Sequence, residues 1–284
     1  MSSDRLPPRG PRASFAELMR QPEERFTVGE AALAVAAAEY PDLDVEHYLA
    51  VLEEMGGEAK SRLRRARSAD ETVRLFSHFV MEELDFHGNR EEFEDPRNSF
   101  LNDVIDRRTG IPITLAVICM EVGRRAGIDV RGVNFPGRFL AKYSHPAGFE
   151  LVIDPYDGGR ILSEADCQTL LDEMSNGTLA YSPLLLRSAT TKQIVVRMLN
   201  NLKRIYVQSH YFHKALRVAD MILAAAPSDA GELRERGLLQ AELANYVQAQ
   251  ADLNAALERT PDPAAAAAIR QTLDRIDAIQ AALK

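Results

Sequence analysis

Side chains that commonly act as nucleophiles or bases are few in this chain. The cysteines are Cys119 and Cys167. A cysteine nucleophile needs a lowered thiol pKa and a base close by. Cys119 falls about two turns inside a predicted helix, and Cys167 has no histidine near it in the sequence. We therefore predict that both thiols pack in the core and do not react.

The histidines offer little more chemistry. They are His47, His78, His87, His145, His210 and His213. His210 and His213 are spaced three apart on one predicted helix, which is half of a metal site, but no cysteine or carboxylate pair completes it. His145 falls in a predicted hairpin loop, where a side chain points away from the start of the preceding strand. The sequence thus predicts no metal centre, and no cofactor is indicated.

Asp154, followed by Pro155, ends the last of three predicted strands in a tight turn. The strands cover residues 130–135, 138–143 and 149–154. An apolar helix predicted over residues 113–126 begins beside Pro112 and leads into them. A buried helix that feeds a small antiparallel sheet, with earlier helices packed around both, is an α+β arrangement.

The segments around this unit are predicted to be mostly helical. Within residues 27–89 the apolar spacing predicts three helices. These are residues 31–38, residues 44–67 and a helix capped by Asp70. Residues 91–100 are polar and contain Asp95-Pro96, so they are predicted as a loop. A further helix begins near Ser163, and residues 175–190 are predicted as a second loop.

An interval of 34 residues recurs in the C-terminal third, where Ala215 and Pro227 are followed by Ala249 and Pro261. That period is typical of tetratricopeptide repeats. The alanines let paired helices approach closely, and the proline ends the second helix of each pair. The predicted repeats cover residues 196–229 and 230–263. Lys203 departs from the pattern, because it stands 34 residues before Gly237.

Two repeats alone cannot bury their apolar faces. At one end, an amphipathic helix over residues 264–283 is predicted to cap them. At the other end, the helix predicted over residues 191–208 is apolar enough to join them to the preceding domain. We therefore predict one rigid unit in which residues 15–187 form the first domain and residues 188–284 the repeat module, after a disordered arm over residues 1–14.

Bulk properties exclude several classes of function. The 284 residues are 46% hydrophobic and 27% charged, as in soluble globular proteins. The net charge of −8 argues against nucleic-acid binding. No uncharged run exceeds 13 residues, which is too short to span a bilayer, and the N-terminus lacks the apolar core of a secretory signal. Together with the scarcity of cysteine, these features favour a cytoplasmic protein.

Three stretches resemble the core of transglutaminase-like cysteine enzymes. They are Arg-Thr-Gly-Ile-Pro-Ile-Thr-Leu-Ala at residues 108–116, Asn-Phe-Pro-Gly-Arg-Phe-Leu at residues 134–140, and Ile-Asp-Pro-Tyr-Asp-Gly-Gly at residues 153–159. Combined with the repeats, they resemble bacterial SirB-type proteins, in which a transglutaminase-like (papain-like) domain precedes tetratricopeptide repeats. The resemblance covers roughly residues 15–280.

The resemblance implies a catalytic triad that this chain lacks in two places. The nucleophile position falls within residues 112–114, where there is no cysteine and Thr114 is the only hydroxyl. The base position falls on Arg138, and arginine does not lose its proton near neutral pH. Only the orienting acid, Asp154, remains. Arg138 and Asp154 are expected either to form a cross-strand ion pair or to line a pocket for a carboxylate or peptide terminus.

The favoured function is therefore a non-catalytic scaffold or regulator that binds a protein or peptide through the repeats. The predicted partner-binding residues are Tyr206, His210, His213 and Arg236. An amide-bond hydrolase or transferase that uses Thr114 is the alternative, and a DNA-binding regulator is disfavoured by the acidic charge. The sequence makes no prediction of oligomeric state.

Overall fold

The computed structural model describes residues 14–282. The predicted arm lies outside that range except for Ser14. The Ser14 hydroxyl accepts a hydrogen bond from the backbone N–H of Glu17, and the Glu17 carboxylate accepts one from the backbone N–H of Ser14. Ser14 therefore caps the first helix, α1 (Phe15–Met19).

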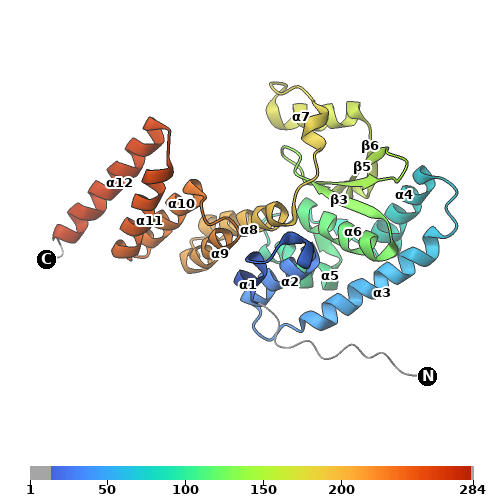
Figure 1. Cartoon of the computed structure of the whole chain (residues 1–284), viewed down its shortest axis with the longest axis horizontal. Coiled ribbons are helices and arrows are strands. Elements are labelled where there is room, and N and C mark those ends of the chain that lie inside the picture. The colour runs from blue at the N-terminus through green and yellow to red at the C-terminus, as the bar shows by residue number, and fades with distance from the viewer. Residues whose placement is uncertain (1–13, 283–284) are drawn as a thin grey trace.

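Helices dominate the first part of the chain, as predicted (Figure 1). They are α2 (Val28–Glu39), α3 (Val45–Leu63), α4 (Ala69–His78), a π-helical turn (Phe79–Glu83), a 3₁₀ turn (Pro96–Ser99) and α5 (Leu101–Arg107). The prediction that Asp70 caps a helix is wrong, because the Ser68 hydroxyl accepts the hydrogen bond from the N–H of Glu71. Asp70 instead lies inside the first turn and pairs with Arg74.

The helix predicted before the sheet is α6 (Pro112–Ala126), with Pro112 in its first turn and Gly127 in the left-handed conformation after its last. The sheet that follows is an antiparallel meander in the order β3-β4-β5-β6. Its strands are β3 (Asp129–Val133), β4 (Leu140–Ser144), β5 (Glu150–Asp154) and β6 (Arg160–Leu162).

Two details of the sheet differ from the prediction. The second strand begins at Leu140 and not at Arg138, because Arg138 still belongs to the turn that follows β3. The fourth strand, β6, was not predicted, since three residues are too few to show an alternating pattern.

Both faces of the sheet are covered. Ala141, Tyr143 and Ile153 turn toward α6 and join the largest core cluster. Residues at alternate positions, such as Leu140 and Val152, turn to the other face and pack with α7 (Glu164–Ser175). Figure 1 shows α6 and α7 on opposite sides of the strands. The fold is thus α+β.

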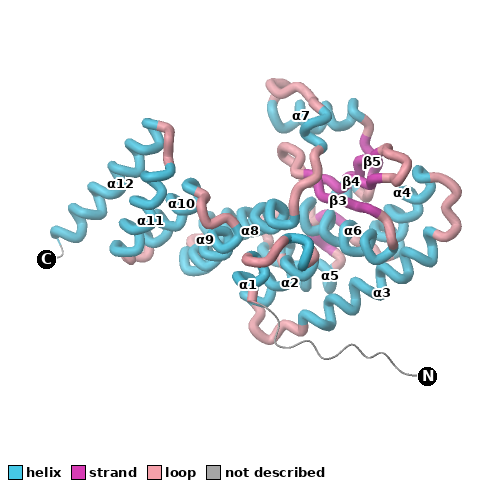
Figure 2. Tube along the Cα trace, viewed as in Figure 1, coloured by secondary structure: helices cyan, strands magenta, loops and turns pink. Residues whose placement is uncertain are grey.

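The repeat module consists of paired antiparallel helices (Figure 2). They are α8 (Thr191–Gln208), α9 (Phe212–Ala225), α10 (Ala230–Glu242), α11 (Tyr246–Arg259) and α12 (Pro263–Ala282). A side chain at Gly237 would place its Cβ 2.8 Å from Leu253, which explains the small residue there. One repeat earlier, 34 residues before Gly237 and Leu253, the sequence has Lys203 and Ala219.

The upstream stacking surface predicted for the repeats is present. A single buried cluster contains Val195, Leu199 and Tyr206 of α8, Ala219 of α9, and Phe15 of α1. The sequence indicated α8 as the joining helix but did not indicate that α1 and α2 also join this cluster. The repeats and the preceding helices therefore share one core.

None of the helices within residues 14–282 combines the length and the apolar character needed to cross a membrane.

Candidate functional site

Arg138 and Asp154 lie in direct contact at the end of the sheet. Nη1 of Arg138 donates to Oδ2 of Asp154 at 2.7 Å, and the two side chains are 28% and 2% exposed. Oδ1 of Asp154 accepts from the backbone N–H groups of Tyr156 and Asp157 at 3.0 and 3.3 Å. The carboxylate therefore closes the turn after β5 and holds the guanidinium through one hydrogen bond.

Tyr156 fills the space beside this pair. Its hydroxyl donates to the carbonyl of Asn89 at 2.8 Å. The guanidinium carbons of Arg138 and Arg90 lie 5.4 and 5.7 Å from its ring centroid, within cation–π range. A Cβ on Gly88 would lie 2.5 Å from the ring, so only glycine allows this approach. Burial raises the pKa of the Tyr156 phenol, which keeps it protonated as a donor.

Thr114, the sequence candidate for a nucleophile, is completely buried. Its hydroxyl donates to the carbonyl of Asn98 at 2.8 Å and accepts from the N–H of Ile111 at 3.1 Å. Within residues 14–282, its hydrogen bonds do not reach Arg138 or Asp154. The hydroxyl thus caps α6 and fixes the loop that contains Asn98.

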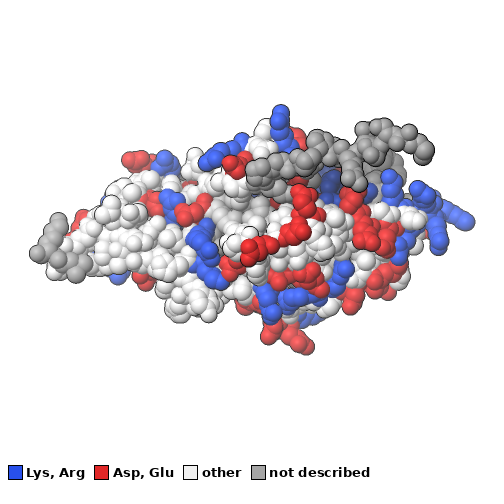
Figure 3. All heavy atoms as spheres, turned by 90° about the horizontal axis from the view of Figure 1, so that it is seen from below, with Lys and Arg blue, Asp and Glu red and all other residues white. Residues whose placement is uncertain are grey.

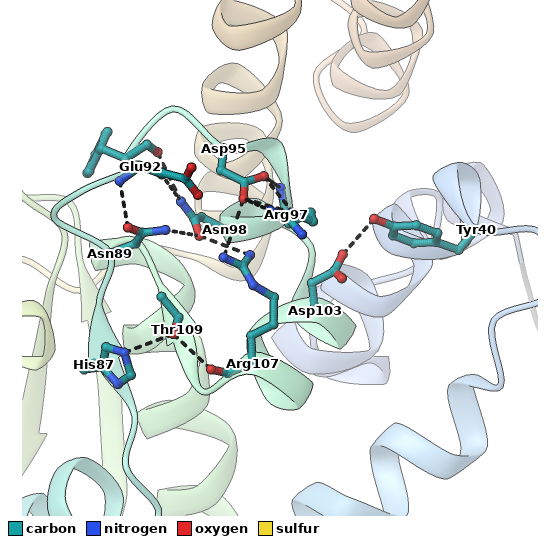
Figure 4. Close-up of polar contacts among 11 residues, drawn as sticks. Tyr40, His87, Asn89, Glu92, Asp95, Arg97, Asn98, Asp103, Arg107 and Thr109 are labelled. Atoms are coloured by element: carbon teal, nitrogen blue, oxygen red, sulfur yellow. Dashed lines mark hydrogen bonds and ion pairs between the residues drawn. The ribbon is translucent and has the colours of Figure 1, made fainter.

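Asn98 holds that loop in place, as Figure 4 shows. Its amide nitrogen donates to the carbonyl of Glu92 at 2.7 Å, and its amide oxygen accepts from Asn89 at 3.2 Å and from Arg107 at 3.4 Å. Arg107 also lies 3.5 Å from the Asp95 carboxylate. These contacts tie the predicted loop to Asn89 and Arg107, whereas the buried hydroxyl of Ser99 has no hydrogen-bond partner within residues 14–282.

The same view contains a pair that the sequence reasoning missed. His87 and Thr109 are direct partners in a short parallel ladder between β1 (His87–Gly88) and β2 (Thr109–Gly110). Nδ1 of His87 lies 2.9 Å from the carbonyl of Asp85, so it donates there, and Nε2 lies 3.1 Å from the Thr109 hydroxyl. The histidine side chain is 56% exposed. Only the ladder register, which is not readable from two-residue strands, brings the two together.

Both cysteines are buried, as predicted. Burial raises the pKa of the Cys119 thiol to about 12 and also raises that of Cys167. Because the thiolate is the reactive form, both should react slowly with a thiol reagent at neutral pH. The double change Cys119→Ala and Cys167→Ala should cost about 1–2 kcal/mol of stability through lost packing, measured by urea unfolding, and leave function intact. Rapid labelling of folded protein would contradict this.

The four predicted partner-binding residues have different surroundings. Tyr206 is 3% exposed and lies in the shared core, so it is not available to a partner. Arg236 is tied to Asp252 at 2.5 Å and to Asp220 at 2.8 Å, which links α10 to α9 and α11. His210 does not lie on a helix as predicted, but in the turn between α8 and α9 with φ of 59°. His213 is on α9 and exposed.

His210 does border a hollow in the surface of the repeats. This hollow, called the apolar hollow below, has a volume of about 810 Å³ and lies between α8 and α10. Val207 and Leu238 line it and are 40% and 38% exposed, and Phe212 and Leu239 also contribute. Figure 3 shows that the face of the repeats seen from below is largely uncharged, whereas acidic and basic side chains intermingle over the larger lobe.

No group of three His, Cys, Asp or Glu side chains suited to a metal ion occurs within residues 14–282. The candidate sites are therefore the Arg138–Asp154 contact and the apolar hollow.

The fold and its sites define a transglutaminase-like domain followed by tetratricopeptide repeats. A model of the transglutaminase-like superfamily matches residues 46–200, and a tetratricopeptide-repeat model matches residues 202–274. The chain belongs to the transglutaminase-like superfamily, in the group whose members are called UPF0162 proteins.

The relatives extend over most of the chain. A UPF0162 protein of Xylella fastidiosa (strain 9a5c) is 35% identical over 242 residues, which is 84% of this chain and 86% of that protein. A UPF0162 protein of Vibrio cholerae is 30% identical and covers 83% of this chain and 87% of its own length. F-box only protein 21 of Mus musculus is 30% identical over 179 residues, 59% of this chain but 27% of that protein.

The crystal structure of menin aligns with 86% of this chain and 68% of its own at 12% identity and a TM-score of 0.40, too low a similarity to indicate a shared fold.

Proposed function

We propose that this protein is a non-catalytic, SirB-type scaffold or regulator that acts in the cytoplasm and binds a partner protein or peptide through its repeats. Residues 15–187 would form the transglutaminase-like domain and residues 188–284 the repeat module. The observation that carries the proposal is the apolar hollow, where Val207 and Leu238 remain exposed between α8 and α10. Exposed apolar side chains that line a concave surface are typical of a binding site.

The Arg138–Asp154 contact and the buried Thr114 support the non-catalytic half of the proposal. Arginine occupies the base position, and its charge is committed to Asp154. The hydroxyl of Thr114 has no access to solvent, because the residue is completely buried. For a substrate to reach the Thr114 hydroxyl, the first turn of α6 would have to unwind.

The direct test changes the hollow within the full chain. Removing α8 to α12 is unsuitable, because it would expose the shared core. Leu238→Asp should abolish capture of a partner that the wild-type protein binds, since a charge would replace an apolar contact. Ile279→Asp is the matched control, because Ile279 is 40% exposed on α12 and does not line the hollow.

The readout is quantitative mass spectrometry of captured proteins, with circular dichroism to confirm that each variant is folded. A partner that both variants capture equally would contradict the repeat-groove proposal. Turnover of a model amide or ester by the wild-type chain, lost in Thr114→Val, would instead support the amide-bond hydrolase or transferase.

A further inference from the structure

A second hollow continues the surface of α8 toward the transglutaminase-like domain. It has a volume of about 830 Å³ and is bounded by the 3₁₀ turn Pro183–Leu186, the first half of α8 and the end of α9. Asn200 lines both this hollow and the apolar hollow. The two hollows therefore adjoin and form one groove along α8.

The charges in this second hollow, called the cationic hollow below, have one sign. Arg187, Lys192 and Arg197 line it, and within residues 14–282 its lining contains no Asp or Glu. Within the described part of the chain, the side chains of Arg187, Lys192 and Arg197 form no ion pair. Glu23 lies beside the hollow, where its carboxylate accepts a hydrogen bond from the backbone N–H of Lys192 at 3.4 Å. Three cations without acidic partners are unusual in a chain with a net charge of −8.

Arg197 shows that the positive charge is held in place. It is partly buried, donates to the carbonyl of Phe135 at 3.4 Å, and lies 5.6 Å from the ring centroid of Phe139. Burial lowers its pKa, because no carboxylate offsets the loss of water. An anionic group entering the hollow would supply that missing partner.

The apolar hollow differs in charge. Glu235 and Glu242 line it, and its two cations already have acidic partners, Lys203 with Glu232 and Glu235, and Arg204 with Glu94. A bound segment would therefore place acidic residues beside the first half of α8 and apolar residues beside the second half. The amide of Asn200, which has no hydrogen bond within residues 14–282, lies where the two halves meet and can bond to the backbone of the segment.

We infer that the groove binds an extended, acidic segment of a partner protein, with its acidic side chains in the cationic hollow and an apolar side chain in the apolar hollow. This inference rests on the proposed function and names its ligand. From Gln193 to Val207 the helix rises about 21 Å, so about six extended residues span the groove.

The test uses fluorescence anisotropy with the full chain and labelled synthetic peptides of about eight residues. One peptide has four glutamates beside two leucines, a second has glutamines in place of the glutamates, and a third has lysines. The glutamate peptide should bind at least tenfold more tightly than the glutamine peptide, and its affinity should fall as salt is added, because exposed charges are screened. The lysine peptide should not bind.

Two variants locate the effect. The double change Arg187→Glu and Lys192→Glu should weaken the glutamate peptide at least tenfold. The double change Arg270→Glu and Arg275→Glu on α12 alters the net charge equally and should leave affinity unchanged, since neither residue lines either hollow. Leu238→Asp should weaken binding of both the glutamate and the glutamine peptides.

The outcomes separate this inference from the proposed function. If the glutamate and glutamine peptides bind with equal affinity and Leu238→Asp abolishes the binding of both, the inference that the ligand is acidic is wrong. The proposal that the repeats bind a peptide would then still hold. Two other outcomes would show a general effect of charge and would contradict the inference. One is an equal loss of affinity in the two charge-reversal variants. The other is competition by single-stranded RNA or anionic lipid vesicles that is as strong as competition by the peptide. Failure of any peptide to bind would also overturn it, whereas partner capture sensitive to Leu238→Asp would still stand.

Discussion

The change Asp154→Asn is expected to lower the free energy of unfolding by about 3 kcal/mol. The Asp154 side chain is 2% exposed and accepts three hydrogen bonds, one of them from Arg138. An asparagine can keep an acceptor toward the backbone but presents an amide or a neutral oxygen to the guanidinium, which loses its counter-charge. Arg138→Met should cost less, about 1–2 kcal/mol, because the carboxylate keeps two backbone donors. Urea unfolding measures both.

A double-mutant cycle isolates the contact itself. The double variant should cost less than the sum of the two single changes, since each single change already breaks the same hydrogen bond. Asp129→Asn is the matched control, because Asp129 and Arg131 form a pair at 2.7 Å that is 46% and 56% exposed, and it should cost under about 1 kcal/mol. Additive costs at Arg138 and Asp154 would show that the pair contributes no coupling. Loss of partner binding in Arg138→Met with unchanged stability would make the arginine a ligand-facing group.

The change Lys203→Met is expected to cost about 3 kcal/mol near pH 7. Lys203 is 5% exposed and pairs with Glu232, which is also 5% exposed, and with Glu235 at 2.5 Å. One carboxylate oxygen of Glu232 has no hydrogen-bond partner in the described structure. Removing the lysine would leave a buried carboxylate without a counter-charge, between two repeats that depend on each other for burial.

The cost of Lys203→Met should fall as the pH is lowered. Burial raises the pKa of Glu232 and hydrogen bonding to Lys203 opposes the rise, so loss of the lysine raises it further. A carboxyl with a raised pKa binds its proton more tightly in the folded state, so stability is lost above the folded pKa and regained as the pH falls toward the ordinary value near about 4.3. Urea unfolding of both proteins at several pH values measures this.

Two further variants test whether the buried carboxylate of Glu232 causes the loss of stability. Glu235→Gln should cost under about 1 kcal/mol, because Glu235 is 46% exposed. Adding Glu232→Leu to Lys203→Met should recover most of the loss, since an apolar pair replaces the buried charges. A cost of Lys203→Met that is independent of pH would show that lost packing and not the carboxylate is responsible.

Local patterns in the sequence correctly predicted most of the elements. The 34-residue interval predicted the helix pairs α8 to α11, because each repeat is specified by residues close together in the chain. The three strand-like runs and the placement of Pro112 at a helix start predicted the helix-to-sheet core. Errors fell at Arg138, His210, Asp70 and β6, where a turn, a cap or a three-residue strand decides the structure.

The position of the candidate sites depended on contacts between distant segments. The family resemblance brought Arg138 and Asp154 together, either as an ion pair or as the lining of a pocket. Only the fold shows that they form the ion pair and that Asp154 uses its second oxygen to close a turn beside Tyr156. Thr114 was the alternative nucleophile, but it is completely buried. Its burial depends on Asn98, held by a network that joins Asn89 to Arg107.

The sequence by itself determined the order of the two modules, the absence of a cysteine at residues 112–114 and the lysine at the position of a repeat glycine, because these are properties of residue identity and spacing. Only the tertiary structure decided which repeat residues remain exposed. Tyr206 is buried because α1 and α2 also pack against the repeats, whereas Val207, the next residue on α8, faces the groove. Helical periodicity shows that two residues lie on different faces, but which face is covered depends on segments nearly 200 residues away in the chain.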